Sequence, residues 1–185
     1  MAGGSGERFW PVSRKDRPKQ LLKLTHPEQT LLEEAVERIS PLIPKDHILI
    51  ATGKPLEEPV RIASLVPDGG VLAEPAKRNT LGCLAWVAAQ LLSRGEDSKG
   101  TVMAILTADH KIGDPEDFRA TVAKALTAAE KTAGLVTIGI RPSRAETGYG
   151  YVELGDAFDS EEPKVYRSAS FREKPNQEAA ERYVE

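Results

Sequence analysis

A glycine-rich segment near the start of the chain could hold a phosphate chain. Glycines stand at positions 3, 4 and 6, and a tightly curled loop without side chains can present bare N–H groups to phosphate oxygens. Arg8 and Lys19 add positive charge nearby. The spacing is neither the Walker pattern nor the G-x-G-x-x-G fingerprint. A flexible linker-like segment is the alternative interpretation, although disordered segments rarely contain an aromatic residue such as Trp10.

Two carboxylates follow short apolar runs. Asp109 comes soon after the run 101–107, and a carboxylate at the carboxyl end of a strand can hold Mg²⁺ against phosphate oxygens. A turn or helix cap is the alternative role of Asp109. Glu74 follows the run 71–73 and could accept hydrogen bonds from the edge of a nucleotide base. The start of the next helix would add anion affinity there, and a surface loop with a helix cap is the alternative.

Two motifs in the last third of the chain could contact a second ligand. Gly148 and Gly150 alternate with tyrosines, which in a strand indicates close approach of a ligand, or else a hairpin or bulge. Glu173 could accept hydrogen bonds from sugar hydroxyls, and Lys174 could hold a sugar phosphate. A salt-bridged strand end is the alternative for this pair.

The elements that must position these residues alternate between strand and helix patterns. Capping signals and apolar periodicity predict helices at 30–39, near 60–65, at 80–92, at 114–131 and from 176 onward. Short β-branched or apolar runs predict strands at 47–52, 71–73, 101–107 and 135–140, and polar alternation predicts strands at 149–154 and 164–172. The alternation through residue 140 predicts an α/β domain with a largely parallel sheet. In such sheets ligands bind outside the carboxyl ends of the strands, where Glu74 and Asp109 fall.

Composition narrows the class of protein. The 185 residues are enough for one domain, and the formal net charge of -3 argues against a general nucleic-acid binder. No apolar stretch has the length of a membrane span, and no signal peptide is recognisable. Cys83 is the single cysteine, which excludes an internal disulfide and fits a reducing, cytoplasmic location. We expect its side chain in the core.

Five segments, in order along essentially the whole chain, together resemble the sugar nucleotidyltransferases. They are GGSGERFWPVSR followed by RPKQLL, then AEPAKRNT, TADH, ETGYGYVE and FREKP. The FWPVSR form and the AEPAKRNT segment are similar to the guanylyl branch of that family. The resemblance implies a three-layer α/β/α, Rossmann-like fold with a mixed, mostly parallel sheet.

The resemblance also implies a reaction and a set of site residues. Mannose 1-phosphate and GTP would give GDP-mannose and pyrophosphate, assisted by Mg²⁺, with no nucleic acid or membrane partner; a homo-oligomer is compatible with it. Arg8, Lys19 and Asp109 would be catalytic, and Asp109 would also bind the metal. The nucleotide would contact Ala2, Gly3, Gly4, Ser5, Gly6, Glu74, Arg78, Asn79 and Thr80. The sugar phosphate would contact Gly148, Tyr149, Glu173 and Lys174.

The chain also departs from the family pattern. Family members have a strand before the glycine loop and a further strand with a second metal carboxylate, so residues 1–185 are expected to be a catalytic domain truncated at both ends. We therefore expect weak or no turnover from this chain. Thr107 stands where the family usually has Pro, and Glu7 where many members have Thr. A related enzyme for another sugar 1-phosphate or nucleotide, and a non-catalytic nucleotide-sugar-binding module, are the alternative functions.

Overall fold

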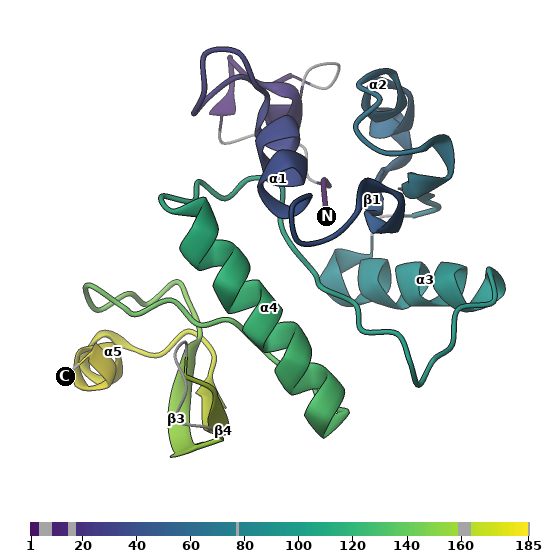
Figure 1. Ribbon diagram of the computed structural model, residues 1–185. Coiled ribbons are helices and arrows are strands. Elements are labelled where there is room, and N and C mark those ends of the chain that lie inside the picture. Colours follow the sequence, from purple (N-terminus) through teal and green to yellow (C-terminus); the bar gives the residue numbers. More distant parts are fainter. Residues whose placement is uncertain (4–8, 15–17, 77, 159–163, 185) are drawn as a thin grey trace. The chain divides into compact units, whose positions relative to one another are not determined.

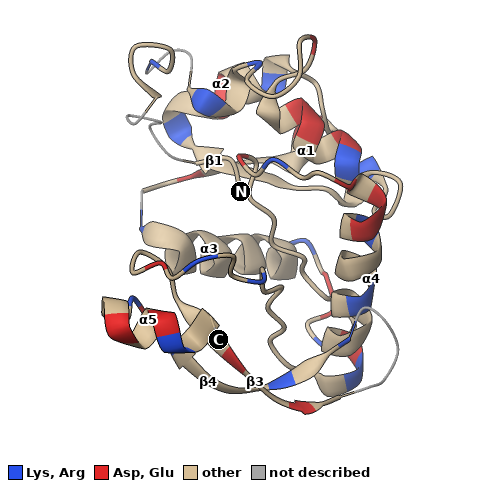
Figure 2. Ribbon diagram, turned by 90° about the vertical axis from the view of Figure 1, so that its left-hand side faces the viewer, with Lys and Arg blue, Asp and Glu red and all other residues tan. Residues whose placement is uncertain are grey.

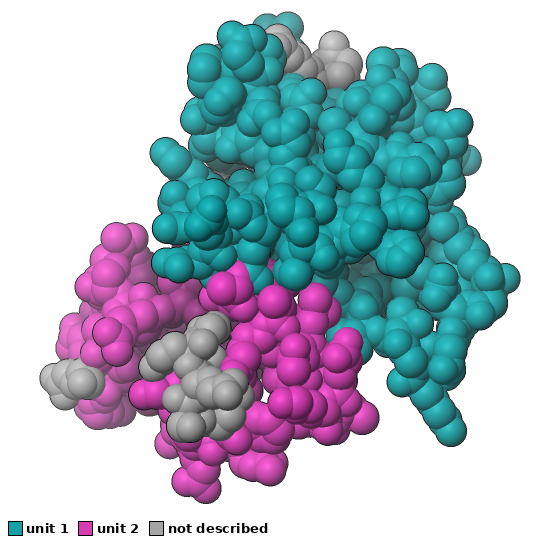
Figure 3. Space-filling view, viewed as in Figure 1, with its two compact units in different colours: residues 1–119 teal, residues 120–185 magenta. Residues whose placement is uncertain are grey.

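The structure is a computed structural model that describes residues 1–3, 9–14, 18–76, 78–158 and 164–184 (Figure 1). The chain divides into two units, Met1–Arg119 and Ala120–Glu185, which Figure 3 distinguishes by colour. Each unit is described by itself.

The first unit is built on parallel backbone pairing. β1 (Ile50–Gly53) pairs in parallel with β2 (Val71–Glu74). On the other side of β1, the N–H of Ala2 donates to the carbonyl of Ala51 at 2.8 Å. Met1 is bonded to the segment 106–108. Its amino group donates to Leu106 O at 2.6 Å, and its carbonyl accepts from Ala108 N at 3.0 Å. This is the pattern of a parallel ladder, so residues 1–3 lie between β1 and the segment 106–108.

Helices cover both faces of this small sheet. Successive strand residues point to opposite faces, and two buried clusters follow that alternation. One cluster joins the sheet to α1 (Leu31–Ile39) and α2 (Glu57–Ile62), and it includes Leu32, Val36, Ile50, Val60 and Val71. The other joins the sheet to α3 (Asn79–Ser93), and it contains Ala51, Leu72, Cys83 and Val87. The predicted α/β class and the three layers are confirmed (Figure 1). Cys83 is buried, as predicted.

Two predicted strands are wrong. The segments 101–107 and 135–140 have no strand assignment in the described part of the chain. The first is bonded at its end to Met1, and the second leaves Leu135 and Ile140 highly exposed. Apolar runs report a tendency to be buried and extended, whereas a strand also needs a neighbouring strand to accept its hydrogen bonds. The other predicted strands form, although β1 begins at Ile50 and not at residue 47.

Helix α1 begins at the predicted capping box. The Thr30 hydroxyl accepts from Glu33 N at 3.2 Å, and the Glu33 carboxylate accepts from Thr30 N at 2.6 Å. These hydrogen bonds hold the pKa of Glu33 below its ordinary value, with the backbone N–H of Thr30 as the largest cause. The buried face of α1 carries Leu32 and Val36, so this cap fixes where a core helix starts.

Thr30→Ala is expected to lower the free energy of unfolding by about 1 kcal/mol, because Ala cannot accept the hydrogen bond from the first turn. Urea denaturation followed by circular dichroism measures the change. Thr30→Ser keeps the acceptor oxygen and should stay close to the wild type. Equal midpoints for Thr30→Ala and the wild type would show that the cap contributes nothing to stability.

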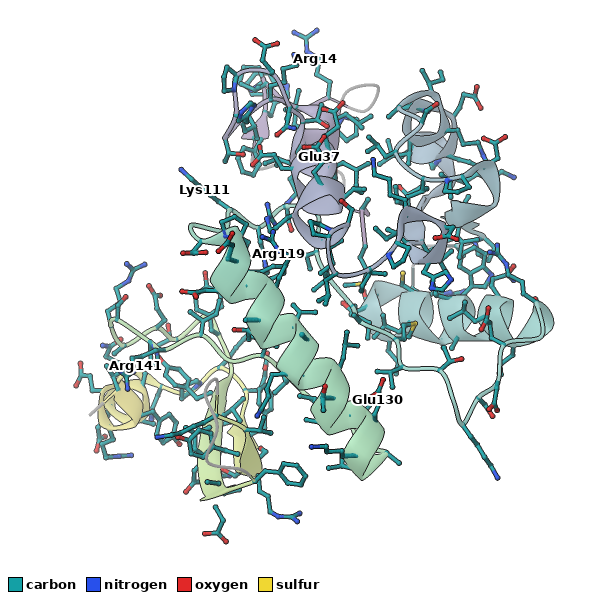
Figure 4. All side chains as sticks on the ribbon, in the orientation of Figure 1. Arg14, Glu37, Lys111, Arg119, Glu130 and Arg141 are labelled. Carbon is teal, nitrogen blue, oxygen red and sulfur yellow. The ribbon has the colours of Figure 1, made fainter. Side chains whose placement is uncertain are left out.

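Helix α4 (Pro115–Thr132) begins where the pair Asp114-Pro115 predicts it, with Asp114 as the cap and Pro115 as the first helical residue. Asp114 Oδ1 accepts from the N–H groups of Glu116 and Asp117 at 2.8 and 3.1 Å. In the first unit, Arg119 Nη1 donates to the carbonyl of Arg38 at 3.2 Å and so joins the start of α4 to the end of α1 (Figure 4). The guanidinium of Arg38 in turn lies 5.8 Å from the ring centre of Phe118.

The second unit contains an antiparallel hairpin and a helix. β3 (Tyr151–Ala157) pairs with β4 (Tyr166–Arg172), which confirms the prediction of antiparallel polar strands. Asn176 Oδ1 accepts from Ala179 N at 2.9 Å and caps α5 (Gln177–Val184) as predicted. The rings of Tyr151 and Tyr183 lie 5.4 Å apart and join α5 to the hairpin.

Helix α3 differs from its prediction at the start. The sequence pattern predicts Asn79 or Thr80 as its N-cap. Arg78 occupies that position instead and makes no side-chain cap hydrogen bond, so this prediction is wrong. Asn79 has φ of 55°, a conformation that Asn tolerates better than most residues. Figure 2 shows α3 without Lys, Arg, Asp or Glu colours along its length, in contrast to α1. Within the described residues, no helix combines the length and apolarity that crossing a membrane requires.

Candidate active site

The start of the glycine-rich segment is anchored in the core of the first unit. Ala2 is 2% exposed, and its carbonyl accepts a hydrogen bond from the buried Thr52 Oγ1 at 3.1 Å. The carbonyl of Gly3 accepts from the side-chain amide of Gln20, which is also buried. The predicted phosphate-binding residues Gly4, Ser5, Gly6 and Arg8 lie outside the described residues. Side-chain hydrogen bonds from Thr52 and Gln20 therefore hold the backbone of Ala2 and Gly3, which directly precede those positions.

Thr52→Val is expected to lower the free energy of unfolding by about 1–2 kcal/mol, because the buried carbonyl of Ala2 would lose its side-chain donor. Valine has nearly the same shape as threonine, so the loss reports mainly the hydrogen bond. Urea denaturation measures it, with Thr52→Ser as the control that keeps the hydroxyl. An unchanged unfolding midpoint for Thr52→Val would contradict the anchoring role.

Lys19 and Asp109, which are 90 residues apart, meet in an ion pair. Lys19 Nζ donates to Asp109 Oδ2, and the two side chains are 20% and 35% exposed. Lys19 lies in the 3₁₀ turn Lys19–Leu21, and its Nζ is 5.7 Å from the ring centre of Phe9. Asp109 follows Ala108, whose N–H is bonded to Met1. Two predicted catalytic residues therefore share one site beside the start of the glycine-rich segment.

The charge state of Asp109 is set by opposing causes. Burial by itself would raise the pKa of this carboxyl, but the hydrogen bond from Lys19, the charge of Lys19 and the nearby His110 outweigh it. The pKa of Asp109 is therefore held below its ordinary value, and the group is a carboxylate at neutral pH. An ionised oxygen donor is what a hard divalent cation requires.

The donor set fits a divalent cation that is held jointly with a ligand. Within the described residues, no group of three or more His, Cys, Asp or Glu side chains could hold a metal by itself. Mg²⁺ commonly binds through one or two carboxylates together with substrate phosphates, and keeps several waters. The single carboxylate of Asp109, beside a candidate phosphate loop, matches that mode of binding.

Glu74 lies at the same end of the sheet as the start of the loop. A Cβ atom built on Gly3 would come within 3.9 Å of Glu74 Oε1. Burial raises the pKa of the Cys83 thiol, and the negative charge of Glu74 and its interaction with the thiol raise the pKa further. The predicted nucleotide-binding residues Arg78, Asn79 and Thr80 follow at the exposed start of α3.

The second unit brings its two predicted sugar-phosphate motifs together. Strand pairing places Tyr151 opposite Arg172, and Lys174 N donates to Tyr149 O at 3.2 Å. Lys174 has φ of 43° and its Nζ pairs with the Glu173 carboxylate. A Cβ on Gly150 would lie 3.0 Å from Glu173 Oε2. The two motifs thus share one end of the hairpin. A Cβ atom built on Gly148 would meet no atom within 4 Å. The salt-bridged strand end, formed by Glu173 and Lys174, is also present.

Sequence reasoning missed three residues of the site. Thr52 and Gln20 hold Ala2 and Gly3 by side-chain hydrogen bonds, and Phe9 contacts Lys19. Gln20 directly follows Lys19 in the segment RPKQLL, so its position in the sequence could have indicated that it lies at the site. Thr52 ends a run of β-branched and apolar residues and gives no such signal, because its partner is 50 residues away.

Comparisons with known proteins show which family the whole chain resembles. A family model described as nucleotidyl transferase matches residues 1–185. The chain is 38% identical to a mannose-1-phosphate guanylyltransferase of Escherichia coli over 188 residues, covering all of this chain and 38% of that protein. It is also 38% identical to the alginate biosynthesis protein AlgA of Pseudomonas aeruginosa, covering all of this chain and 37% of that protein.

A solved structure has the same fold. The crystal structure of a mannose-1-phosphate geranyltransferase from Thermus thermophilus matches with a TM-score of 0.81 and 40% sequence identity. The match covers all of this chain and 51% of that chain. The present chain therefore spans about two fifths of the length of the curated relatives described above.

Proposed function

Because this chain belongs to the nucleotidyl transferase family, we propose that it forms the nucleotide-binding part of an enzyme that transfers GMP from GTP to mannose 1-phosphate. The products are GDP-mannose and pyrophosphate. The observation that carries the proposal is the meeting of Lys19 and Asp109 beside the anchored start of the glycine-rich segment. The identity to mannose-1-phosphate guanylyltransferases supports the choice of GTP and mannose 1-phosphate.

The reaction is an in-line displacement at phosphorus. A phosphate oxygen of mannose 1-phosphate attacks the α-phosphorus of GTP, a new P–O bond forms, and the bond to the leaving pyrophosphate breaks. The attacking oxygen is already anionic, so the enzyme needs no general base. Both reactants carry several negative charges, and the protein must therefore hold them together and neutralise that charge.

Each predicted residue has a part in holding the nucleotide. The backbone from Ala2 to Gly6 would cradle the triphosphate, and Arg8 would bind the departing pyrophosphate and draw off its developing charge. Lys19 would bind the α-phosphate or the attacking phosphate. Glu74, with Arg78, Asn79 and Thr80, would lie along the guanine and the ribose.

A second group of residues would hold the metal and the sugar. Asp109 would bind the divalent cation, for which we propose Mg²⁺; when bound, the cation neutralises phosphate charge. In the second unit, Gly148, Tyr149, Glu173 and Lys174 would bind mannose and its phosphate. The shared hairpin end of these residues supports that assignment.

We also propose that the protein acts in the cytoplasm. Its buried, unpaired Cys83 supports a reducing compartment.

A matrix of nucleoside triphosphates against sugar 1-phosphates, scored by pyrophosphate release, tests the proposed function. It is run on residues 1–185 and, where the gene encodes more residues, on the longer product. We expect the highest rate with GTP and mannose 1-phosphate, and weak or no turnover from residues 1–185 alone. A higher rate with another pair would overturn the substrate assignment, and binding of GTP without turnover by the longer product would indicate a non-catalytic module.

A further inference from the structure

Lys19 has an anionic partner within the protein itself. Its Nζ donates to Asp109 Oδ2, and the side chain is 20% exposed. The ring of Phe9 contributes a second contact at 5.7 Å. A phosphate that binds Lys19 must therefore take the ammonium away from Asp109, or share it.

Both members of the pair are held by their neighbours. Gln20, next to Lys19, is buried and donates to the carbonyl of Gly3. Ala108, next to Asp109, is buried and donates to the carbonyl of Met1. The residues next to Lys19 and Asp109 are therefore both bonded to the backbone of residues 1–3, which holds the two side chains near each other.

A divalent cation and the Lys19 ammonium compete for one carboxylate. Both are attracted to the negative charge of Asp109, and two cations held at the same carboxylate repel each other. The described residues offer no acidic cluster that would hold the cation otherwise. Asp109 can therefore bind a divalent cation well only after Lys19 has left, and Lys19 can leave at little cost only when another anion accepts it.

We propose that Lys19 keeps Asp109 from binding a divalent cation until a phosphate chain takes the Lys19 ammonium, so that cation and polyphosphate bind cooperatively. The inference rests on the proposed function, which places both ligands at this site. Before the exchange the carboxylate and the ammonium neutralise each other. After the exchange Asp109 faces the cation and Lys19 faces a phosphate, so no charge is left unpaired at any stage.

The first test measures Mn²⁺ affinity of residues 1–185 without nucleotide, from the electron paramagnetic resonance signal of free Mn²⁺. Lys19→Gln is expected to bind Mn²⁺ at least about tenfold tighter than the wild type, a size typical of coupling between sites. Lys19→Arg keeps the blocking cation and should match the wild type. Adding Asp109→Asn to Lys19→Gln should abolish the gain.

Lys23→Gln is the matched control. Lys23 is four residues away, and its Nζ lies 3.7 Å from Glu28 on the surface, so its loss changes net charge equally without freeing Asp109. If Lys19→Gln is poorly folded by circular dichroism, Lys19→Met replaces it. A Mn²⁺ affinity of Lys19→Gln within about twofold of the wild type or of Lys23→Gln would overturn the proposal.

The second test adds inorganic tripolyphosphate, with its own Mn²⁺ complex measured in protein-free solution. The wild type should gain Mn²⁺ affinity when tripolyphosphate is added. Lys19→Gln should gain less, because it lacks the ammonium that occupies Asp109 in the wild type. Equal gains would overturn the proposal. Neither probe contains a nucleoside or a sugar, so a positive result combined with no GTP-dependent turnover by the longer product would reject the proposed function and leave this inference standing.

Discussion

Asp109→Asn is expected to lower kcat for pyrophosphate release by at least about 100-fold, in whichever form of the protein turns over GTP and mannose 1-phosphate. Loss of one group that stabilises transition-state charge typically costs 10²–10³ in rate. Asn keeps the size of the side chain but removes the charge that a divalent cation requires. The pyrophosphate-release assay at saturating substrate measures the change.

The structure explains why this single change is so damaging. Asp109 is the carboxylate that faces Lys19 at the start of the glycine-rich segment, and no acidic cluster of described residues could take its place. Before a phosphate binds, its substitution also leaves the partly buried Lys19 ammonium without its anionic partner. Both predicted catalytic groups are therefore disturbed before the substrates bind.

Asp114→Asn is the matched control for Asp109→Asn. It is the same chemical change five residues away, at the cap of α4, where Asp114 accepts from Glu116 N and Asp117 N. Asn caps helices about as well as Asp, so activity and stability should stay near the wild type. Activity of Asp109→Asn within about threefold of the wild type would contradict the assigned role, because a loss of metal-binding charge predicts a far larger effect.

Leu32→Ala is expected to lower the free energy of unfolding by about 3 kcal/mol, within the range of 2–5 kcal/mol for buried Leu to Ala. Leu32 is 3% exposed and belongs to the buried cluster under α1 and α2. Truncation removes apolar contacts and leaves a cavity that the surrounding residues fill only in part. Urea denaturation measures the loss.

The same cluster reaches the candidate site. It includes Ala2, at the start of the glycine-rich segment, and Ala108, which precedes Asp109. We therefore expect Leu32→Ala to weaken tripolyphosphate binding as well. Leu81→Ala is the control, because Leu81 is 79% exposed on α3 and its loss should change stability by no more than about 0.5 kcal/mol. Equal losses for both variants would contradict the assignment of Leu32 to the core.

Much of the local structure could be predicted from the sequence. Thr30, Asp114 and Asn176 cap helices where their side chains indicated. The parallel pairing of β1 with β2 and the antiparallel hairpin follow the two strand patterns. These predictions are correct because a helix cap is a contact between residues two or three apart in the sequence. The strand patterns in turn reflect which faces of the strands are buried.

Other elements could not be predicted by the same means. The segment 101–107 is apolar like a central strand, but its recorded pairing is confined to its end, at Met1. The segment 135–140 pairs with no strand in the described residues. Hydrophobic periodicity carries no information about whether a neighbouring backbone is present to pair with.

In the candidate site, too, local features could be predicted and long-range contacts could not. Candidate residues for binding phosphate, metal and sugar could be recognised in the sequence, because residue types and their order along the chain are local features. The pairing of Lys19 with Asp109 across 90 residues and the hydrogen bond from Thr52 to Ala2 could be recognised only in the folded chain. Such contacts depend on how parallel strands lie side by side, and residue spacing along the chain does not record that arrangement.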